Sequence, residues 1–221
     1  MGIQPDIIVC RSEHELDQSL KDKIALFCNV PNGNVLQNLD VEYLYEAPLA
    51  MEKENLAQTV CKCLRLDCPE PDIKGWENMV ESIKHLDKEV TVALVGKYTA
   101  LHDAYISVVE ALKHGGIAER ATVNLNWVDS ELLSDENAEE ILGNSDGIIV
   151  PGGFGDRGVE GMITAAKYAR EHKIPYLGLC LGMQVAIIEY ARHVCKLNDA
   201  HSIELLSLIH ISEPTRHAQI S

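Results

Sequence analysis

The residues best suited to covalent chemistry are the cysteine and the two glycines of Gly178-Leu-Cys180-Leu-Gly182. This spacing matches the nucleophile elbow, in which the nucleophile occupies a strained turn from a strand into a helix. The apolar run before Cys180 predicts the strand, and apolar residues spaced three apart from Val185 to Ala191 predict the helix. The positive end of that helix favours a thiolate, and its unused amides could bind an oxyanion. A free cysteine is also commonly a small buried apolar residue, so the surrounding sequence must decide.

A glycine-rich stretch follows another predicted strand, Gly147–Val150. From Gly153 to Gly158 it matches the pattern G-x-G-x-x-G, which is found in dinucleotide-binding sites. Such a site also needs an acidic residue about 20 positions later, where this sequence has an apolar run. We therefore favour a loop whose backbone N–H groups face Cys180. Together with the amide of Leu181 they would form a two-sided oxyanion hole.

A general base for Cys180 is missing from the pattern. A cysteine nucleophile usually works with a histidine that an acidic residue orients. The histidines that follow it are His193, His201, His210 and His217. His193 lies more than two turns along the predicted helix, and the other three lie where no strand is predicted. No complete triad is visible, so we expect the chain by itself to lack turnover.

The elements that would position these residues alternate regularly from Glu89 onward. Strands are predicted at 90–95, 123–128, 147–150 and 176–179, and helices at 104–114, 138–142 and 159–172. This order predicts a parallel sheet covered by helices on both faces. Parallel strands end at one edge, so Lys97, Gly153 and Cys180 should meet there. Gly115-Gly116 predicts the C-terminal cap of the first of these helices.

The first 66 residues contain only two predicted strands, Ile7–Cys10 and Lys23–Cys28, which is too little sheet for an independent core. Ser12 and Glu15 form a capping-box pattern that predicts a helix up to about Asp22. A helix is also predicted from 51 to 66. The segment 67–72, with two prolines and three acidic residues, predicts a linker, and helical spacing from 76 to 83 predicts a packing helix.

Composition narrows the classes of function. The 19 Lys and Arg residues against 34 Asp and Glu residues give a net charge of −15, which argues against general attraction to nucleic acid or anionic membranes. Cys61, Cys63 and Cys68 lack the paired C-x-x-C spacing of a zinc site, so we expect no metal site. No apolar run approaches the ~20 residues of a membrane span, and the N-terminus is not a signal peptide. We expect a soluble, cytoplasmic protein.

Several stretches together resemble the CTP synthase family, the glutamine-dependent amidoligases that make CTP from UTP. They are, in chain order, Gly2–Ser12, Lys23–Val30, Val95–Tyr98, Glu110–Gly116, Val150–Gly155, Arg157–Ile163 and Tyr176–Gln184. The resemblance runs from Gly2 to about Glu204. It implies an α/β fold in which a flavodoxin-like parallel sheet flanked by helices, the class I glutamine amidotransferase domain, follows a remnant of a P-loop-type synthetase domain.

The resemblance also implies a domain division. Residues 1–66 match the C-terminal part of the synthetase domain, 67–88 form a linker with a helix, 89–204 form a truncated amidotransferase domain, and 205–221 form a tail without a family counterpart. The family's phosphate-binding loop would lie upstream, and its catalytic His and Glu downstream. We therefore expect a fragment with little glutaminase turnover and no synthetase activity. The synthetase remnant should expose an apolar face.

Residue roles follow by position. Cys180 matches the nucleophile that forms the glutamyl thioester. The matching glutamine-binding positions are Gly153, Phe154, Leu181, Gly182, Met183, Gln184 and Glu204. Glu204 would hold the substrate amino group, although the family pattern Asn-Ser-Thr-Glu appears here as His201-Ser-Ile-Glu204. Lys23 matches a lysine that binds UTP or CTP. The positions that match residues beside ATP are Arg11, Leu39, Asp40 and Val41.

For partners, the resemblance implies UTP, glutamine and ATP with magnesium as ligands, GTP as an allosteric activator and a homotetramer, with neither nucleic acid nor membrane. Two other classes stay open from the residues alone. A cysteine-type α/β hydrolase acting on an ester or lactone would need an Asp and a His at later strand ends. A non-catalytic interaction domain on a glutaminase scaffold would fit the missing triad, but it would leave Cys180 and the Gly153 loop unexplained.

Overall fold

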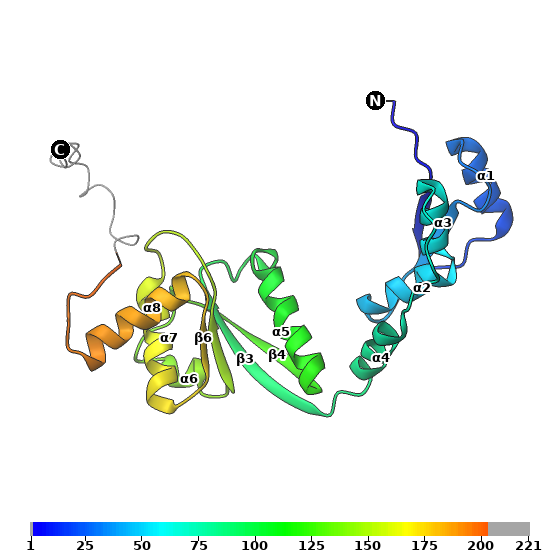
Figure 1. Ribbon diagram of the computed structural model, residues 1–221. Coiled ribbons are helices and arrows are strands. Elements are labelled where there is room, and N and C mark those ends of the chain that lie inside the picture. The colour runs from blue at the N-terminus through cyan, green and yellow to red at the C-terminus, as the bar shows by residue number, and fades with distance from the viewer. Residues whose placement is uncertain (1, 203–221) are drawn as a thin grey trace. The chain divides into compact units, whose positions relative to one another are not determined.

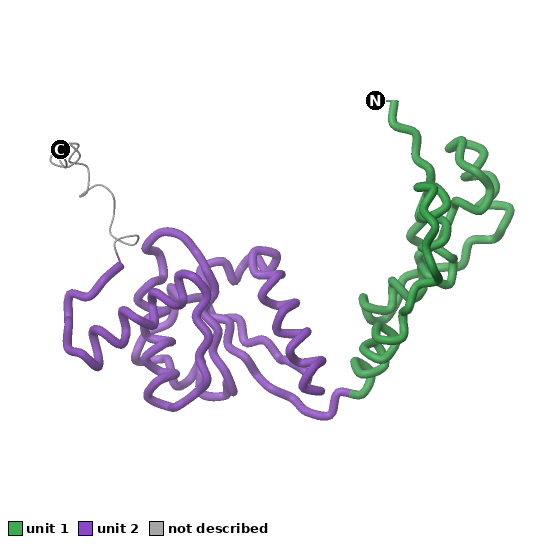
Figure 2. Tube along the Cα trace, in the orientation of Figure 1, with its two compact units in different colours: residues 1–85 green, residues 86–221 purple. Residues whose placement is uncertain are grey.

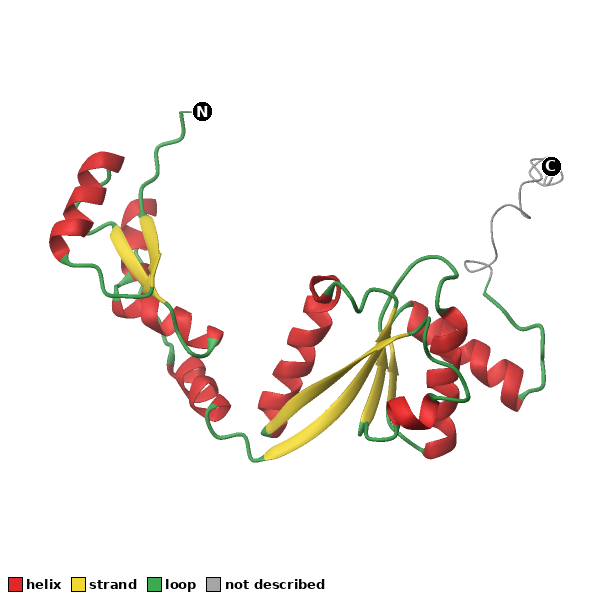
Figure 3. Cartoon of the chain, turned by 180° about the vertical axis from the view of Figure 1, so that it is seen from behind, coloured by secondary structure: helices red, strands yellow, loops and turns green. Residues whose placement is uncertain are grey.

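The computed structural model describes residues 2–202, which form two compact units that divide between His85 and Leu86 (Figure 2). Each unit has its own sheet and its own helices (Figure 3). None of the helices within residues 2–202 is both long and apolar enough to cross a membrane.

The first unit is built on two parallel strands, β1 (Ile8–Ser12) and β2 (Val35–Leu39). Its helices are α1 (Gln18–Cys28), α2 (Ala47–Lys53), α3 (Leu56–Leu64) and α4 (Lys74–Ile83), with a 3-10 turn at Leu44–Glu46. The core is small and centres on Ala25, Val30 and Val35. Leu26 and Phe27 on α1 are 77% and 86% exposed, so part of this unit's apolar surface is uncovered.

The single helix predicted from 51 to 66 is instead two helices, α2 and α3, separated at Glu54 and Asn55. Two predictions for the start of this unit are also wrong. The run Lys23–Cys28 belongs to α1 and not to a strand, because a short apolar run has no clear period. The helix begins after Asp17, whose carboxylate accepts from the backbone N–H of Leu20 at 2.8 Å, and not at Ser12, which ends β1. The second strand instead follows the turn before Val35.

The helix predicted for residues 76–83 is present as α4, and it packs against the 3-10 turn at Leu44–Glu46 of the same unit. The indole N–H of Trp76 donates to the carbonyl of Tyr45 at 2.7 Å, and Lys84 pairs with Glu46 at 2.7 Å. The division between the units therefore falls after this helix.

The second unit carries the predicted parallel sheet. Its strands are β3 (Lys88–Gly96), β4 (Ala121–Asp129), β5 (Gly147–Val150) and β6 (Tyr176–Gly178). All neighbours pair in parallel, in the order β4-β3-β5-β6. β4 lies on one side of β3, and β5 and β6 lie on the other, so the strand order reverses at the boundary between β3 and β5. In open α/β sheets such a switch point is where ligands bind, beyond the strand C-termini.

Helices cover both faces of this sheet, as predicted. They are α5 (Ile106–Glu119), α6 (Ala138–Leu142), α7 (Val159–His172) and α8 (Leu181–Glu189), with a 3-10 turn at His102–Tyr105 and a π-helical turn at Tyr190–Val194. Val95 and Val150 face the core shared with α6, α7 and α8. Leu94 and Ile149, one residue earlier on each strand, face the core shared with α5. Figure 1 shows α5 on one side of the sheet and α6, α7 and α8 on the other.

The predicted cap at Gly115-Gly116 is wrong, because both glycines lie inside α5, whose C-cap is Arg120 with φ 58°. Gly116 instead allows a close approach between helix and sheet. A Cβ at this position would lie 2.8 Å from Cγ2 of Val123 on β4.

Candidate active site

Cys180 occupies the predicted strand-to-helix turn. β6 ends at Gly178, α8 begins at Leu181, and Cys180 between them has φ 53° and ψ −103°. Residues other than glycine rarely adopt a positive φ, and such strain concentrates at functional sites. The thiol is free and the residue exposed. The turn therefore presents the free thiol to solvent at the C-terminal edge of the sheet.

The two flanking glycines make this turn possible by close packing. A Cβ on Gly178 would lie 2.6 Å from the backbone nitrogen of Met183, inside the first turn of α8. A Cβ on Gly182 would lie 2.9 Å from the carbonyl carbon of Val150 on β5. Any larger side chain at either position would force α8 away from the strands, and Cys180 with it.

The glycine loop after β5 runs beside the elbow, as the strand order predicts. A Cβ on Gly152 would lie 3.5 Å from Cβ of Cys180, and one on Gly153 would lie 3.4 Å from Cδ2 of Leu181. Within residues 2–202 the backbone N–H groups of Gly153 and Leu181 have no hydrogen-bond acceptor. Two backbone donors from different loops are thus unused next to the thiol.

Lys97, which follows β3, closes the other side of this loop. Its side chain is almost fully buried, and Nζ donates to the carbonyl oxygens of Phe154, at 3.1 Å, and of Gly155. Burial lowers the pKa of Lys97, and the nearby Asp156 carboxylate partly opposes that shift. Arg157 bonds back to the carbonyl of Lys97 at 3.0 Å. The loop is therefore tied at both ends to the end of β3, while the Phe154 side chain is 90% exposed.

The first turn of α8 holds most of the remaining candidates for glutamine binding. Leu181 and Gly182 are buried, Met183 is exposed and Gln184 is half-buried. The hydroxyl of Ser202 donates to Oε1 of Gln184 at 2.7 Å, which holds residue 202 at this turn. Glu204 lies outside the described residues.

The histidines do not complete the site. His193 lies in the π-helical turn after α8, with Nδ1 3.3 Å from Oε1 of the buried Glu189. At 1.5 Å per helical residue it is roughly 20 Å along the helix from Cys180. His201 is exposed, and His210 and His217 lie outside the described residues. Among residues 2–202 no side chain forms a hydrogen bond to the thiol of Cys180.

In the first unit the structure brings together the four residues matched to an ATP site. They are Arg11, Leu39, Asp40 and Val41, and they line a cavity of about 470 Å³ beyond the ends of β1 and β2. Arg11 Nε is 2.7 Å from Oδ1 of Asp40, and this contact raises the pKa of Arg11. Oδ1 of Asn38, in the same wall, is buried and has no partner among the described residues. Lys23 is exposed on α1 and does not line this cavity.

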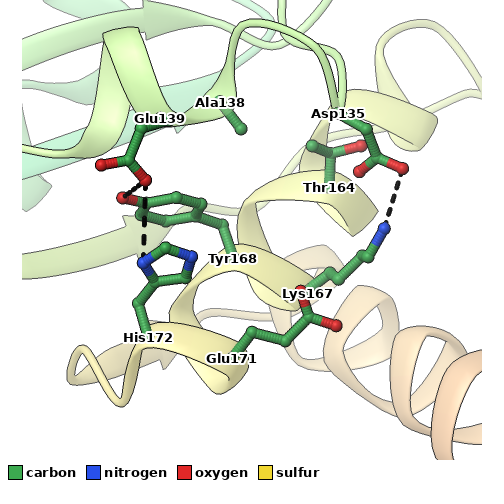
Figure 4. A pocket seen from close by; sticks show the side chains of 8 residues that line it. All are labelled: Asp135, Ala138, Glu139, Thr164, Lys167, Tyr168, Glu171 and His172. Carbon is green, nitrogen blue, oxygen red and sulfur yellow. Dashed lines mark hydrogen bonds and ion pairs between the residues drawn. The ribbon is translucent and has the colours of Figure 1, made fainter.

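A smaller hollow of about 160 Å³ lies between α6 and α7 (Figure 4). Its polar groups satisfy one another: Lys167 pairs with Asp135 at 2.8 Å, and the hydroxyl of Tyr168 donates to Glu139 at 2.8 Å. No residue of the elbow or of the glycine loop lines it, so we assign it no part in the chemistry.

Two protein families match this chain, one in each unit. The glutamine amidotransferase class-I family matches residues 100–213, which runs past Glu204, and the CTP synthase N-terminus family matches residues 1–66. The CTP synthase of Ruminiclostridium cellulolyticum is 56% identical over 204 residues, 92% of this chain. That of Clostridium kluyveri is 58% identical over 205 residues, 93% of this chain. The chain belongs to the CTP synthase family. The resemblance read from the sequence is confirmed.

The chain spans 38% of the length of these two CTP synthases. Among solved structures, the glutaminase domain of Trypanosoma brucei CTPS with bound acivicin matches with a TM-score of 0.50 and 45% identity, covering 53% of this chain and 46% of that one. The predicted amidotransferase fold is confirmed, and the hydrolase and interaction-domain alternatives are not favoured. The strand order predicted that Lys97 lies at the site. Its hydrogen bonds to the loop were not predictable, because nothing in the sequence links Lys97 to carbonyl groups almost 60 positions away.

Proposed function

We propose that this chain carries the nucleophile of the glutamine-hydrolysing site of CTP synthase, Cys180, and that the complete reaction also needs a general base that residues 2–202 do not supply. The thiolate attacks the side-chain amide carbon of glutamine and forms the C–S bond, and the carbonyl oxygen becomes an oxyanion. The amides of Gly153 and Leu181 stabilise that oxyanion. Collapse of the intermediate breaks the C–N bond, and the nitrogen takes up one proton, which balances the proton that the thiol gave up on ionising, and leaves as ammonia. Water then hydrolyses the γ-glutamyl thioester, which releases glutamate and restores the thiol.

One observation supports this proposal above the others. Cys180 is held at φ 53° in an exposed turn, directly beside two backbone donors that have no acceptor among residues 2–202. A structural cysteine would be expected to be buried and unstrained. The same turn supports a glutamine-binding role for Met183 and Gln184. Glu204 is proposed to hold the substrate amino group on the family resemblance alone.

The wider reaction proposed is the ATP-dependent amination of UTP to CTP by the ammonia released. The cavity lined by Arg11, Leu39, Asp40 and Val41 is proposed to hold part of the ATP, because it brings together the four residues that match the family's positions beside ATP. Lys23 is proposed to contact UTP or CTP. Within residues 2–202 no group of three or more His, Cys, Asp or Glu side chains could hold a metal ion, and magnesium bound together with ATP is proposed on family membership alone. GTP activation, a homotetramer and a cytoplasmic location are proposed on family membership alone.

The proposal is tested by the rate at which Cys180 is alkylated in the intact chain. Acivicin, a glutamine analogue with an electrophilic ring, and iodoacetamide, which does not resemble glutamine, are compared by peptide mass spectrometry. We expect acivicin to label Cys180 at least about ten-fold faster than any of the six other cysteines, because only this thiol lies at a glutamine site. C180S should abolish that signal, and steady-state ammonia release should stay at the level of the C180S variant. Equal acivicin labelling of all seven cysteines would contradict the proposal.

A further inference from the structure

Lys97 makes an unusual set of contacts for a lysine. Lys97 is only 4% exposed, and its ammonium donates to two backbone carbonyls, those of Phe154 and Gly155. A buried ammonium is costly unless it is well hydrogen-bonded, and lysines are rarely buried to this extent. Among the described residues it forms no ion pair within 4.0 Å. The charge is thus directed onto the glycine loop itself.

These contacts fix how the loop's peptide groups are turned. In a planar trans peptide the C=O and N–H groups point in opposite directions. Because the carbonyls of Phe154 and Gly155 point at Lys97, the N–H groups of Gly155 and Asp156 point away from it. Within residues 2–202 neither N–H group has an acceptor, and a Cβ built on Gly155 meets only open space.

The same lysine reaches the elbow through Gly153. A Cβ on Gly153 would lie 3.6 Å from Cδ of Lys97 on one side and 3.4 Å from Cδ2 of Leu181 on the other. The loop is also locked in the reverse direction, because Arg157 donates to the carbonyl of Lys97 at 3.0 Å and pairs with Glu131 at 2.7 Å. A change in the position of the Lys97 side chain would therefore move Gly153 relative to the first residue of α8.

We propose that Lys97 is a positioning residue for glutamine hydrolysis: by binding the carbonyls of Phe154 and Gly155 it holds the loop in the conformation that places the N–H group of Gly153 beside Cys180. Lys97 touches neither the substrate nor the thiol in this role. The inference rests on the proposed function of the Cys180 site.

The test uses the full chain and three variants. K97M removes the ammonium and keeps much of the apolar stem, K97R keeps a cationic donor, and K113M removes an exposed lysine of α5 that pairs with Glu110. Alkylation of Cys180 is measured with acivicin and with iodoacetamide. We expect K97M to lower the rate of alkylation by acivicin by about ten-fold or more, because the analogue loses the backbone N–H donors that bind it. The rate with iodoacetamide should change less than about three-fold, because this small reagent does not depend on those donors. K97R should recover part of the acivicin rate, and K113M should match the parent chain.

A second measurement keeps this inference separate from the proposed function. Amide hydrogen exchange of residues 153–158 reports the loop directly, and we expect about ten-fold faster exchange in K97M than in the parent chain. If acivicin fails to label Cys180 selectively in the parent chain, the proposed function fails, and exchange alone then decides whether Lys97 holds the loop. Unchanged exchange in K97M, or a parallel fall of both alkylation rates, would overturn the positioning role.

Discussion

The hydroxyl of Tyr176 donates to the carbonyl oxygen of Gly182 at 2.8 Å, across the turn that carries Cys180. The bond ties the first residue of β6 to the first turn of α8, so the two arms of the elbow are linked by a side chain as well as by the backbone. Burial, with a contribution from the Glu189 carboxylate, raises the pKa of Tyr176 above its usual value. The phenol therefore stays protonated, and remains a donor, throughout the pH range in which the protein would work.

Replacing Tyr176 with Phe removes this donor and leaves the ring. We expect Y176F to lower the free energy of unfolding by about 1 kcal/mol, since a partly buried carbonyl loses one partner. It should also slow the reaction of Cys180 with acivicin, because the elbow loses its side-chain tether. Urea unfolding and labelling kinetics measure the two effects. Y190F, at an exposed tyrosine after α8, is the control; equal effects in both variants would contradict the role of the tether.

Glu189, almost fully buried at the end of α8, pairs with Arg170 of α7 through both carboxylate oxygens at 2.8 to 3.1 Å. We expect R170M to cost about 3–5 kcal/mol of stability, because it strands a buried carboxylate. E189Q combined with R170M should cost clearly less than the sum of the single changes. Chemical denaturation of all four chains forms the cycle. Additive costs would show that the pair is not coupled. The exposed pair of Lys113 with Glu110 should contribute below about 1 kcal/mol.

Two glycine-to-alanine changes should have opposite signs. G182A places a methyl group against the carbonyl of Val150, so either α8 or β5 must shift. We expect a loss of more than about 2 kcal/mol and slower labelling of Cys180. Gly75 lies in α4 with open space around its would-be Cβ, so G75A should stabilise the first unit by about 0.5–1 kcal/mol. Thermal melts distinguish the two, and a stabilised G182A would contradict the close packing described here.

The lowered pKa of Lys97 predicts a specific pH dependence of stability. In the window between its folded-state pKa and the ordinary value of 10.5, the unfolded chain binds more protons at this site than the folded chain. Stability contributed by this group therefore rises with pH through that window, and it is lowest below it. We expect the difference in unfolding free energy between the parent chain and K97M to shift in favour of the parent as pH rises towards 10.5. A difference that stays constant with pH would contradict the lowered pKa.

Much of the second unit was predictable because its strands and helices alternate with clear periods. The predicted bounds of β5, α6 and α7 agree with the structure, since each is a patterned segment between turn residues. In the first unit, Lys23–Cys28 was misread because its apolar residues serve a helix with one side exposed. Only Ala25 of this run is buried, and the local sequence does not show which side the core occupies.

The candidate site divides in the same way. Cys180 and the glycines around it were predictable, because a tight turn needs particular residue types at fixed spacing. The contacts of Lys97 with Phe154 and Gly155 were not, because backbone carbonyls leave no signature in the residue types that carry them. The bond between Tyr176 and Gly182 was hidden for the same reason.

The φ of 53° at Cys180 sets thermodynamic stability against reactivity at one position. A glycine there would adopt this backbone conformation without strain, so C180G should raise the free energy of unfolding by about 1–3 kcal/mol while removing the proposed nucleophile. C180A keeps the Cβ atom, and with it the strain, so it should gain little. Denaturation of the two variants isolates the backbone term, and equal stabilities would contradict it. If stability alone decided, glycine would be the favoured residue at position 180. The cysteine found there lowers the free energy of unfolding and in exchange places an exposed thiol at the turn.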